Sequence, residues 1–104
     1  MRFLKDIYDR RIRFTDERWE HIMTDHPEMS NQIGKIKETL LLPDRVVRSL
    51  TDDEVELFYR DYHTTPVTRK YLCIVVKVLI DDLFIITAYF TDTIKKGDLL
   101  WQKK

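Results

Sequence analysis

The sequence predicts an α+β fold in which two N-terminal helices pack on one face of a roughly four-stranded antiparallel sheet. Three observations support this prediction. Residues 70–91 form a long apolar hairpin, two stretches with helical spacing of apolar residues precede it, and helical and strand segments are segregated along the chain. With 104 residues, 43% of them apolar and 35% charged, the chain is expected to fold as one compact domain, residues 1–104.

The hairpin indicates which side chains form the core, because alternate residues of a strand face opposite sides of the sheet. Val78 is predicted to pair with Ile86 through an odd-length loop at residues 81–83. A two-residue loop would instead place Lys77 among aromatic side chains, and burying a charge costs several kcal/mol. The wholly apolar alternate set, predicted to face the helices, consists of Leu72, Ile74, Val76, Val78, Ile80, Phe84, Ile86, Ala88 and Phe90.

The other face of the hairpin is predicted to gather polar groups at its centre. In this register Lys77 lies across from Thr87, and Val75 lies across from Tyr89. Cross-strand neighbours have Cβ atoms about 4.5–5.5 Å apart. An ammonium, a hydroxyl and a phenol therefore converge on a face that the helices leave open. The alternative interpretation is that Lys77 only extends toward solvent and that the other two residues are ordinary strand formers.

Two helices are predicted before the main sheet, after a short alternating segment at residues 11–14 that is interpreted as an edge strand. Thr15 is the expected N-cap of the first helix, which Pro27 ends. The second helix is expected from about residues 28–30 to Leu41. The apolar stripes that are expected to face the sheet contain Trp19, Ile22, Met23, Ile33, Ile36 and Leu40.

Further strands are predicted at residues 45–48, 54–60 and 99–101. In the strand at 54–60, the apolar set Val55, Leu57 and Tyr59 alternates with a set that ends in Arg60. Arg60 is therefore expected to share the open sheet face with Lys77 and Thr87. The connection at residues 61–69 is long enough to contact a ligand.

Composition limits the classes of function. The net charge is zero, so attraction of the whole molecule to nucleic acid is not expected, although residues 10–13, 95–96 and 103–104 are locally basic. The single cysteine, Cys73, is typical of a reducing compartment. The first residues lack the apolar stretch of a secretion signal, and no apolar run approaches the length of a membrane span. A soluble cytoplasmic protein without membrane contact is expected.

No motif predicts a cofactor or a metal centre. The chain has no glycine-rich phosphate loop, no cysteine pair and no serine nucleophile motif, and its carboxylate clusters fall at predicted turns. His21 and His26 are five residues apart, so on a continuous helix they would point about 140° apart. This spacing argues against a metal site built from His21, Asp25 and His26.

The remaining polar groups suit metal-independent cleavage of RNA. The ribose 2′-OH attacks its own phosphate, so the enzyme supplies a base, an acid and cations. His26, displaced from the helix by Pro27, is the predicted acid or base. The alternative interpretation makes His26 a polar cap and His21 a half-buried helix residue. The full candidate site consists of His26, His21, Lys77 and Thr87 as catalytic residues, Arg60 as a phosphate ligand, and Tyr89 and Tyr71 as base-stacking residues.

Several segments together resemble the phage-type branch of the barnase–EndoU–colicin–RelE-like nuclease superfamily. They are residues 18–29 with the sequence His26-Pro27-Glu28, then residues 42–44, 59–60, 74–77, 85–89, 96–97 and Trp101. The resemblance covers about residues 12–102 and implies a RelE/barnase-like fold. It also implies a metal-independent endoribonuclease with functional residues at His21, His26, Arg60, Lys77, Thr87 and Tyr89.

The resemblance further implies the toxin of a toxin–antitoxin pair, with RNA as substrate and a small antitoxin protein as partner. The competing interpretation is a non-catalytic module that binds RNA or a protein on the same fold. The zero net charge favours that alternative, because a nuclease surface is expected to attract phosphate.

Overall fold

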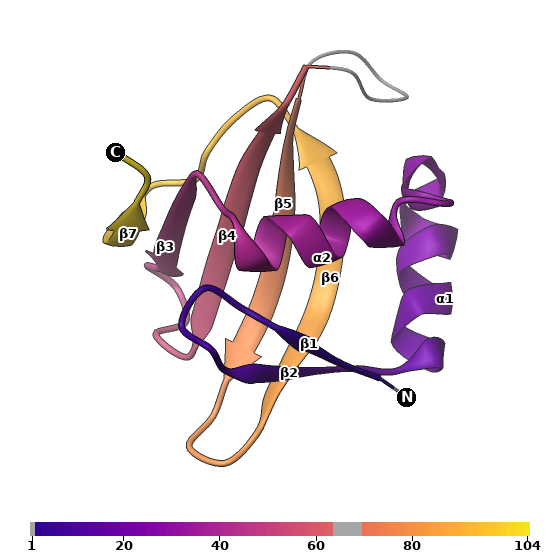
Figure 1. Cartoon of the computed structure of the whole chain (residues 1–104), viewed down its shortest axis with the longest axis horizontal. Helices are drawn as coiled ribbons and strands as arrows, with labels where there is room; N and C mark the ends of the chain where they lie inside the picture. The colour runs from indigo at the N-terminus through magenta and orange to yellow at the C-terminus, as the bar shows by residue number, and fades with distance from the viewer. Residues whose placement is uncertain (1, 64–69) are drawn as a thin grey trace.

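The computed structural model of the chain describes residues 2–63 and 70–104, and within them a mixed sheet dominates the fold (Figure 1). The elements are β1 (Arg2–Lys5), β2 (Arg11–Phe14), α1 (Asp16–Asp25), the short 3₁₀ helix η1 (Pro27–Met29), α2 (Ile33–Leu41), β3 (Arg45–Ser49), β4 (Val55–Tyr62), β5 (Lys70–Val78), β6 (Leu83–Thr91) and β7 (Gly97–Gln102). In this described part of the chain seven strands lie in the order β1-β2-β6-β5-β4-β3-β7, with β2 and β6 parallel and the other neighbouring pairs antiparallel. Most of the connection at 61–69 lies outside the described residues.

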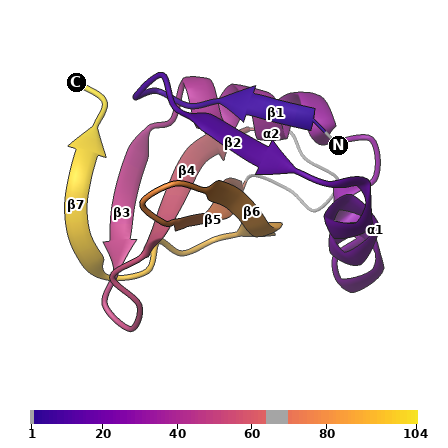
Figure 2. The same cartoon turned by 90° about the horizontal axis from the view of Figure 1, so that it is seen from below.

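The predicted arrangement of two N-terminal helices on a four-stranded antiparallel sheet is therefore wrong. The described chain begins with a β-hairpin, the sheet has seven strands, and one pair is parallel. The two helices also do not share one face of the sheet. α2 lies across a face together with β1 and β2, whereas α1 lies beside the edge of β6 (Figures 1 and 2).

The hairpin of β1 and β2 completes the core on the α2 side. Leu4, Ile12 and Phe14 are buried there, with at most 7% of their surface exposed. Three inward-facing apolar residues in two four-residue strands are a weak signal in a sequence. The hairpin is also fixed by a distant contact, since Arg10 in its turn bonds Glu56 of β4 at 2.7 Å.

The β5–β6 hairpin has a different register from the predicted one. Val78 pairs with Leu83 instead of Ile86, and a β-bulge interrupts the ladder after Val75. The bulge places one additional residue on β6, which reverses the alternation of faces there. As a result Ile85 belongs to the core on the α2 side, and Ile86 packs on the opposite side.

Most of the predicted core is nevertheless found under α2. Leu72, Ile74, Val76 and Ala88 are fully buried in it, with Val78 and Phe90 packed at its margin. Ile80 lies in the turn and is fully exposed, and Phe84 pairs with Lys77 on the other face. The helical contributions to this core are Trp19, Ile22, Ile33, Ile36 and Leu40.

The opposite face of the sheet, called here the outer face, carries a second apolar cluster. Val55, Leu57 and Tyr59 of β4 are buried in it, so the prediction that they face the helices is wrong. Phe58 takes their expected place in the main core. Residues 92–96, called here the strap, connect β6 to β7 on this side of the sheet (Figure 2).

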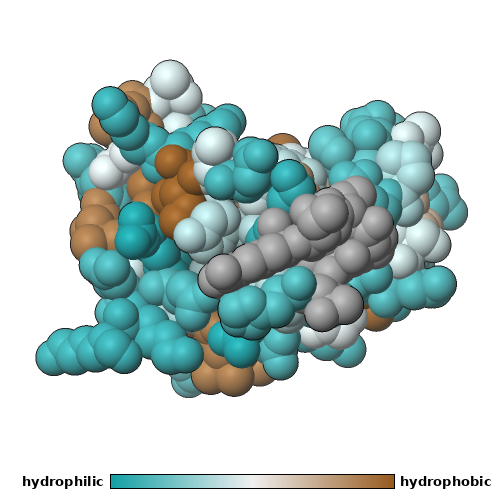
Figure 3. Space-filling model, turned by 90° about the horizontal axis from the view of Figure 1, so that it is seen from above, coloured by the Kyte–Doolittle hydropathy of each residue, from teal (hydrophilic) through white to brown (hydrophobic). Residues whose placement is uncertain are grey.

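The surface seen from the end of the sheet where β4 and β6 finish is mainly hydrophilic, with its hydrophobic residues in separate groups (Figure 3). In the described part of the chain, neither α-helix has the length and apolar character needed to span a bilayer.

Candidate functional site on the outer face

Four of the seven predicted site residues lie on the outer face. Tyr71 and Lys77 extend from β5, and Thr87 and Tyr89 extend from β6. Directly paired residues of antiparallel strands share a face. The pairing of Tyr89 with the buried Cys73 therefore places this part of β6 against the second apolar cluster.

His26 reaches the same region from α1. Its backbone N–H donates to Ile22 O at 2.7 Å and ends α1, and Pro27 then begins η1. The imidazole lies with its centroid 5.4 Å from the centroid of the Tyr89 ring, at an angle of 32° between the rings. One third of the side chain is exposed, and Nδ1 lies 3.9 Å from Glu28 Oε2. The ring is thus held at the β6 edge while one part of it stays accessible.

Tyr89 is the outermost of a row of three side chains on β4, β5 and β6, the other two being Tyr59 and Cys73. Tyr59 and Tyr89 are the direct cross-strand partners of Cys73, which is fully buried between them. Burial raises the pKa of Cys73 to about 11 and raises the pKa of both tyrosines above the ordinary value. All three groups are therefore protonated at neutral pH. The uncharged ring of Tyr89 packs against the imidazole of His26 and helps to position it. The Tyr89 hydroxyl keeps its proton and therefore does not act as a base.

Lys77 is already engaged in ion pairs at the turn end of the outer face. Its Nζ lies 2.7 Å from Asp52 Oδ2 and 3.4 Å from Glu54 Oε1, and the hydrogen bond with Asp52 raises the lysine pKa. Because of the bulge it pairs with Phe84. The predicted placement of Lys77 directly across from Thr87 is therefore wrong.

Arg60 lies on the other side of the sheet, contrary to prediction. Its Nη1 donates to Leu42 O at 2.5 Å, and its Nε lies 3.4 Å from Glu38 Oε1, both beside α2. The cause is the orientation of β4, which directs Phe58 and Arg60 toward the main core. Arg60 and Lys77 extend from opposite faces, so they cannot hold one phosphate between them.

His21 is also separated from the outer face. It lies on α1 with 61% of its side chain exposed, and its Nε2 is 3.9 Å from Glu17 Oε1. The structure thus distinguishes between the two histidines. His26 contacts the sheet through Tyr89, and His21 projects from the flank of the helix.

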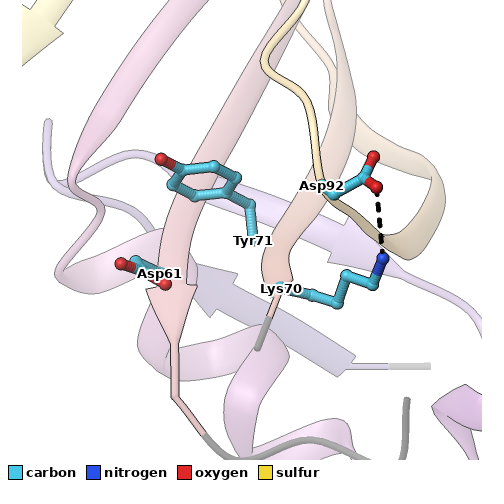
Figure 4. A pocket seen from close by; sticks show the side chains of 4 residues that line it. All are labelled: Asp61, Lys70, Tyr71 and Asp92. Carbon is cyan, nitrogen blue, oxygen red and sulfur yellow. Dashed lines mark hydrogen bonds and ion pairs between the residues drawn. The ribbon is translucent and has the colours of Figure 1, made fainter. Parts of the chain in front are cut away.

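Tyr71 borders a small hollow of about 190 Å³ at the end of the sheet. Its ring packs edge-on against the ring of Tyr59, with the two ring centroids 6.5 Å apart. Figure 4 shows the Tyr71 side chain beside Asp61 of the neighbouring strand, whereas Lys70 points to Asp92 and pairs with it at 3.4 Å. Tyr71 therefore lies on the same face as Tyr89 and next to open space.

Sequence reasoning missed the lysines of the strap as site residues. Lys95 and Lys96 line a groove of about 400 Å³ on the outer face. Their sequence shows only a local basic cluster before a glycine. Nothing in that pattern indicates which face of the sheet the strap crosses, so only the fold relates these lysines to Thr87 and Tyr89.

Within residues 2–63 and 70–104, no three side chains of His, Cys, Asp or Glu are grouped in a way that could hold a metal ion. No family model, curated protein or solved structure matches the chain. The nuclease resemblance therefore stays a prediction.

Proposed function

We propose that this protein is a metal-independent endoribonuclease that acts in the cytoplasm at the β6 edge of its outer face. The observation that best supports this function is the contact of His26 with Tyr89. It brings a partly exposed imidazole to a sheet face that also carries the Thr87 hydroxyl. An imidazole can act as acid or base near neutral pH.

In this proposal each residue has one role. His26 transfers a proton to or from the ribose or the leaving oxygen. Thr87 lies two residues from Tyr89 on the same face and donates a hydrogen bond to a phosphate oxygen. Tyr89 holds the imidazole in position. Tyr71 offers a ring on which a base can stack. Arg60 has no part in the site, and Lys77 has a structural role in its ion pairs with Asp52 and Glu54.

The test compares two histidine variants that differ in position alone. His26→Ala is expected to slow cleavage of single-stranded RNA by about 10²–10⁴-fold, the usual contribution of a general acid or base. His21→Ala, on the exposed flank of α1, is expected to cleave at the wild-type rate. Both rates are measured in single-turnover reactions, and the melting temperature of each variant is recorded.

A folded His26→Ala variant that cleaves at the wild-type rate would show that the acid or base lies elsewhere. Equal losses in both variants would remove the distinction on which the proposal depends. Toxicity on expression, abolished by His26→Ala, is expected if the protein is the toxin of a toxin–antitoxin pair with a small protein as its inhibitor.

A non-catalytic RNA-binding module is the second candidate function. It is favoured by the scarcity of unpaired cations near His26, since Lys77 is neutralised and Arg60 lies on the other face. A wild-type protein that binds RNA without cleaving it would select this function.

A further inference from the structure

We propose that Lys95 and Lys96 hold backbone phosphates of single-stranded RNA in the groove beside the strap. This inference rests on the proposed function and locates the part of the substrate that flanks the cleaved bond. It also supplies the cations that the sequence assigned to Arg60 and Lys77.

The groove has an apolar floor and polar sides. Its floor is formed by Val55, Leu57 and Val75 of the central strands. Lys95 and Lys96 line it from the strap, and Ser49, Thr51 and Asp52 line it from the end of β3 and the turn that follows. At about 400 Å³ it is large enough for one nucleotide, because ligand pockets begin at about 300 Å³. The flat face of an unpaired base can pack on an apolar floor, and a lysine ammonium can pair with the phosphate attached to that nucleotide.

The groove is continuous with the proposed catalytic edge. Val75 pairs with Leu57 on one side and with Thr87 on the other. Thr87 is followed on the same face by Tyr89, which contacts His26. A strand of RNA that crosses the face from the groove therefore reaches Thr87 within two strand spacings, about 10 Å, and continues along β6 past Tyr89 to the imidazole.

The strap holds both lysines at fixed backbone positions. The N–H of Lys95 donates to the hydroxyl of the buried Tyr59 at 3.1 Å, and Ile94 packs into the second apolar cluster. At the end of the strap, a Cβ on Gly97 would collide with Arg48 O, so only glycine fits. A fixed backbone reduces the ordering cost of placing the lysine side chains on a ligand.

The charges of these lysines are available to a ligand. Both side chains are exposed, and neither makes an ion pair with any residue that the structure describes. The acid that lines the groove, Asp52, is paired with Lys77 at 2.7 Å. Neither Lys95 nor Lys96 is therefore held by a carboxylate in a direct ion pair, which favours binding of a polyanion with closely spaced phosphates.

The experiment measures binding separately from cleavage. A short fluorescent RNA with 2′-O-methyl groups cannot be cleaved by 2′-OH attack, and its affinity is followed by anisotropy over a range of salt concentrations. The double variant Lys95→Gln/Lys96→Gln is expected to bind about tenfold more weakly at low salt, with a salt slope lower by about 1.4, because each phosphate contact on a single strand contributes about 0.7. The matched control is Lys37→Gln, which removes an exposed lysine from α2 on the other side of the sheet.

Wild-type affinity and salt slope in the double variant would overturn the assignment of the groove. So would a loss in Lys37→Gln of about half that size, a salt slope lower by about 0.7, since binding would then follow total charge. The result is distinguishable from failure of the proposed function. A wild type that binds the methylated RNA through these lysines but does not cleave unmodified RNA supports the groove and refutes the catalysis. A wild type that cleaves without needing these lysines refutes the groove alone.

Discussion

At the scale of single residues, the row formed by Tyr59, Cys73 and Tyr89 is the part of the outer face most sensitive to pH. Burial raises the pKa of Cys73 from 9.0 to about 11, so the folded protein retains the thiol proton at a pH where the unfolded chain loses it. Stability from this group is fully present below about pH 9 and is lost as the pH rises toward 11. The two tyrosines act in the same direction from their ordinary pKa of 10.0 upward.

We therefore expect the free energy of unfolding, measured by urea titration, to decline above about pH 9. One pKa unit corresponds to about 1.4 kcal/mol, so the thiol alone contributes a loss of about 3 kcal/mol by pH 11. In Cys73→Ala the decline should begin nearer pH 10, where the tyrosines of the unfolded chain ionise. If the free energy of unfolding of the wild type instead stays constant from about pH 9 to pH 10, the buried position of the thiol is contradicted.

Residue-scale predictions succeeded where the cause was local. Pro27 follows His26 directly, and it limits the backbone of the residue before it whatever the rest of the fold is. The position of Arg60 depends instead on which face β4 turns toward the helices. Both alternate sets of β4 contain aromatic residues, Tyr59 in one and Phe58 in the other. The pattern of that strand therefore did not determine its orientation.

At the scale of elements, the hairpin of β1 and β2 depends on Arg10. The guanidinium contacts Asp6 Oδ2 and Glu56 Oε1, each at 2.7 Å. Both carboxylates are almost completely buried, with 2% and 8% of the residue exposed. Asp6 also accepts the backbone N–H groups of Tyr8 and Arg10, which shapes the turn.

Arg10→Ala is expected to lower the free energy of unfolding by about 3–5 kcal/mol, because it leaves two buried carboxylates without a cation. The matched control is Arg11→Ala, which removes an exposed arginine whose guanidinium lies 4.1 Å from the Phe3 ring centroid. That change is expected to cost no more than about 1 kcal/mol. Urea denaturation of both variants decides the question, and equal effects would mean that the buried network does not fix the hairpin.

The register of β5 and β6 shows why elements were predicted better than their pairing. Two strands and a turn follow from the apolar runs on either side of Asp81 and Asp82. Strict alternation, however, assumes that no strand contains an additional residue. The bulge after Val75 breaks that assumption. Neither strand contains a glycine or proline that would indicate a bulge in the sequence. The register is also shifted by two residues before the bulge, because Val75 pairs with Thr87 and not with Tyr89 as predicted, so Lys77 and Thr87 do not form a direct pair.

At the scale of the whole molecule, the parallel contact between β2 and β6 could not be derived from the sequence. It consists of the single pair Arg13 and Phe84, supported by the ion pair of Arg13 with Asp82 at 2.9 Å. Contacts between residues so far apart in the chain leave no periodic signal. The same holds for the strap, whose lysines gain their relation to His26 only when β6 and β7 lie at different places in the sheet.

The last prediction concerns the reaction as a property of the complete molecule. Cleavage of RNA by the wild type is expected to continue at an unchanged rate in excess EDTA, because attack by the 2′-OH with His26 as acid or base needs no metal-bound nucleophile. Two acidic residues at the turn end of the outer face, Asp52 and Glu54, agree with this expectation, since both are paired with Lys77. Single-turnover rates are measured after dialysis against EDTA, and again after Mg²⁺ is restored, with His26→Ala as the reference for lost activity. Loss of cleavage in EDTA that Mg²⁺ reverses would assign the chemistry to a carboxylate–metal site and would remove His26 from its proposed role.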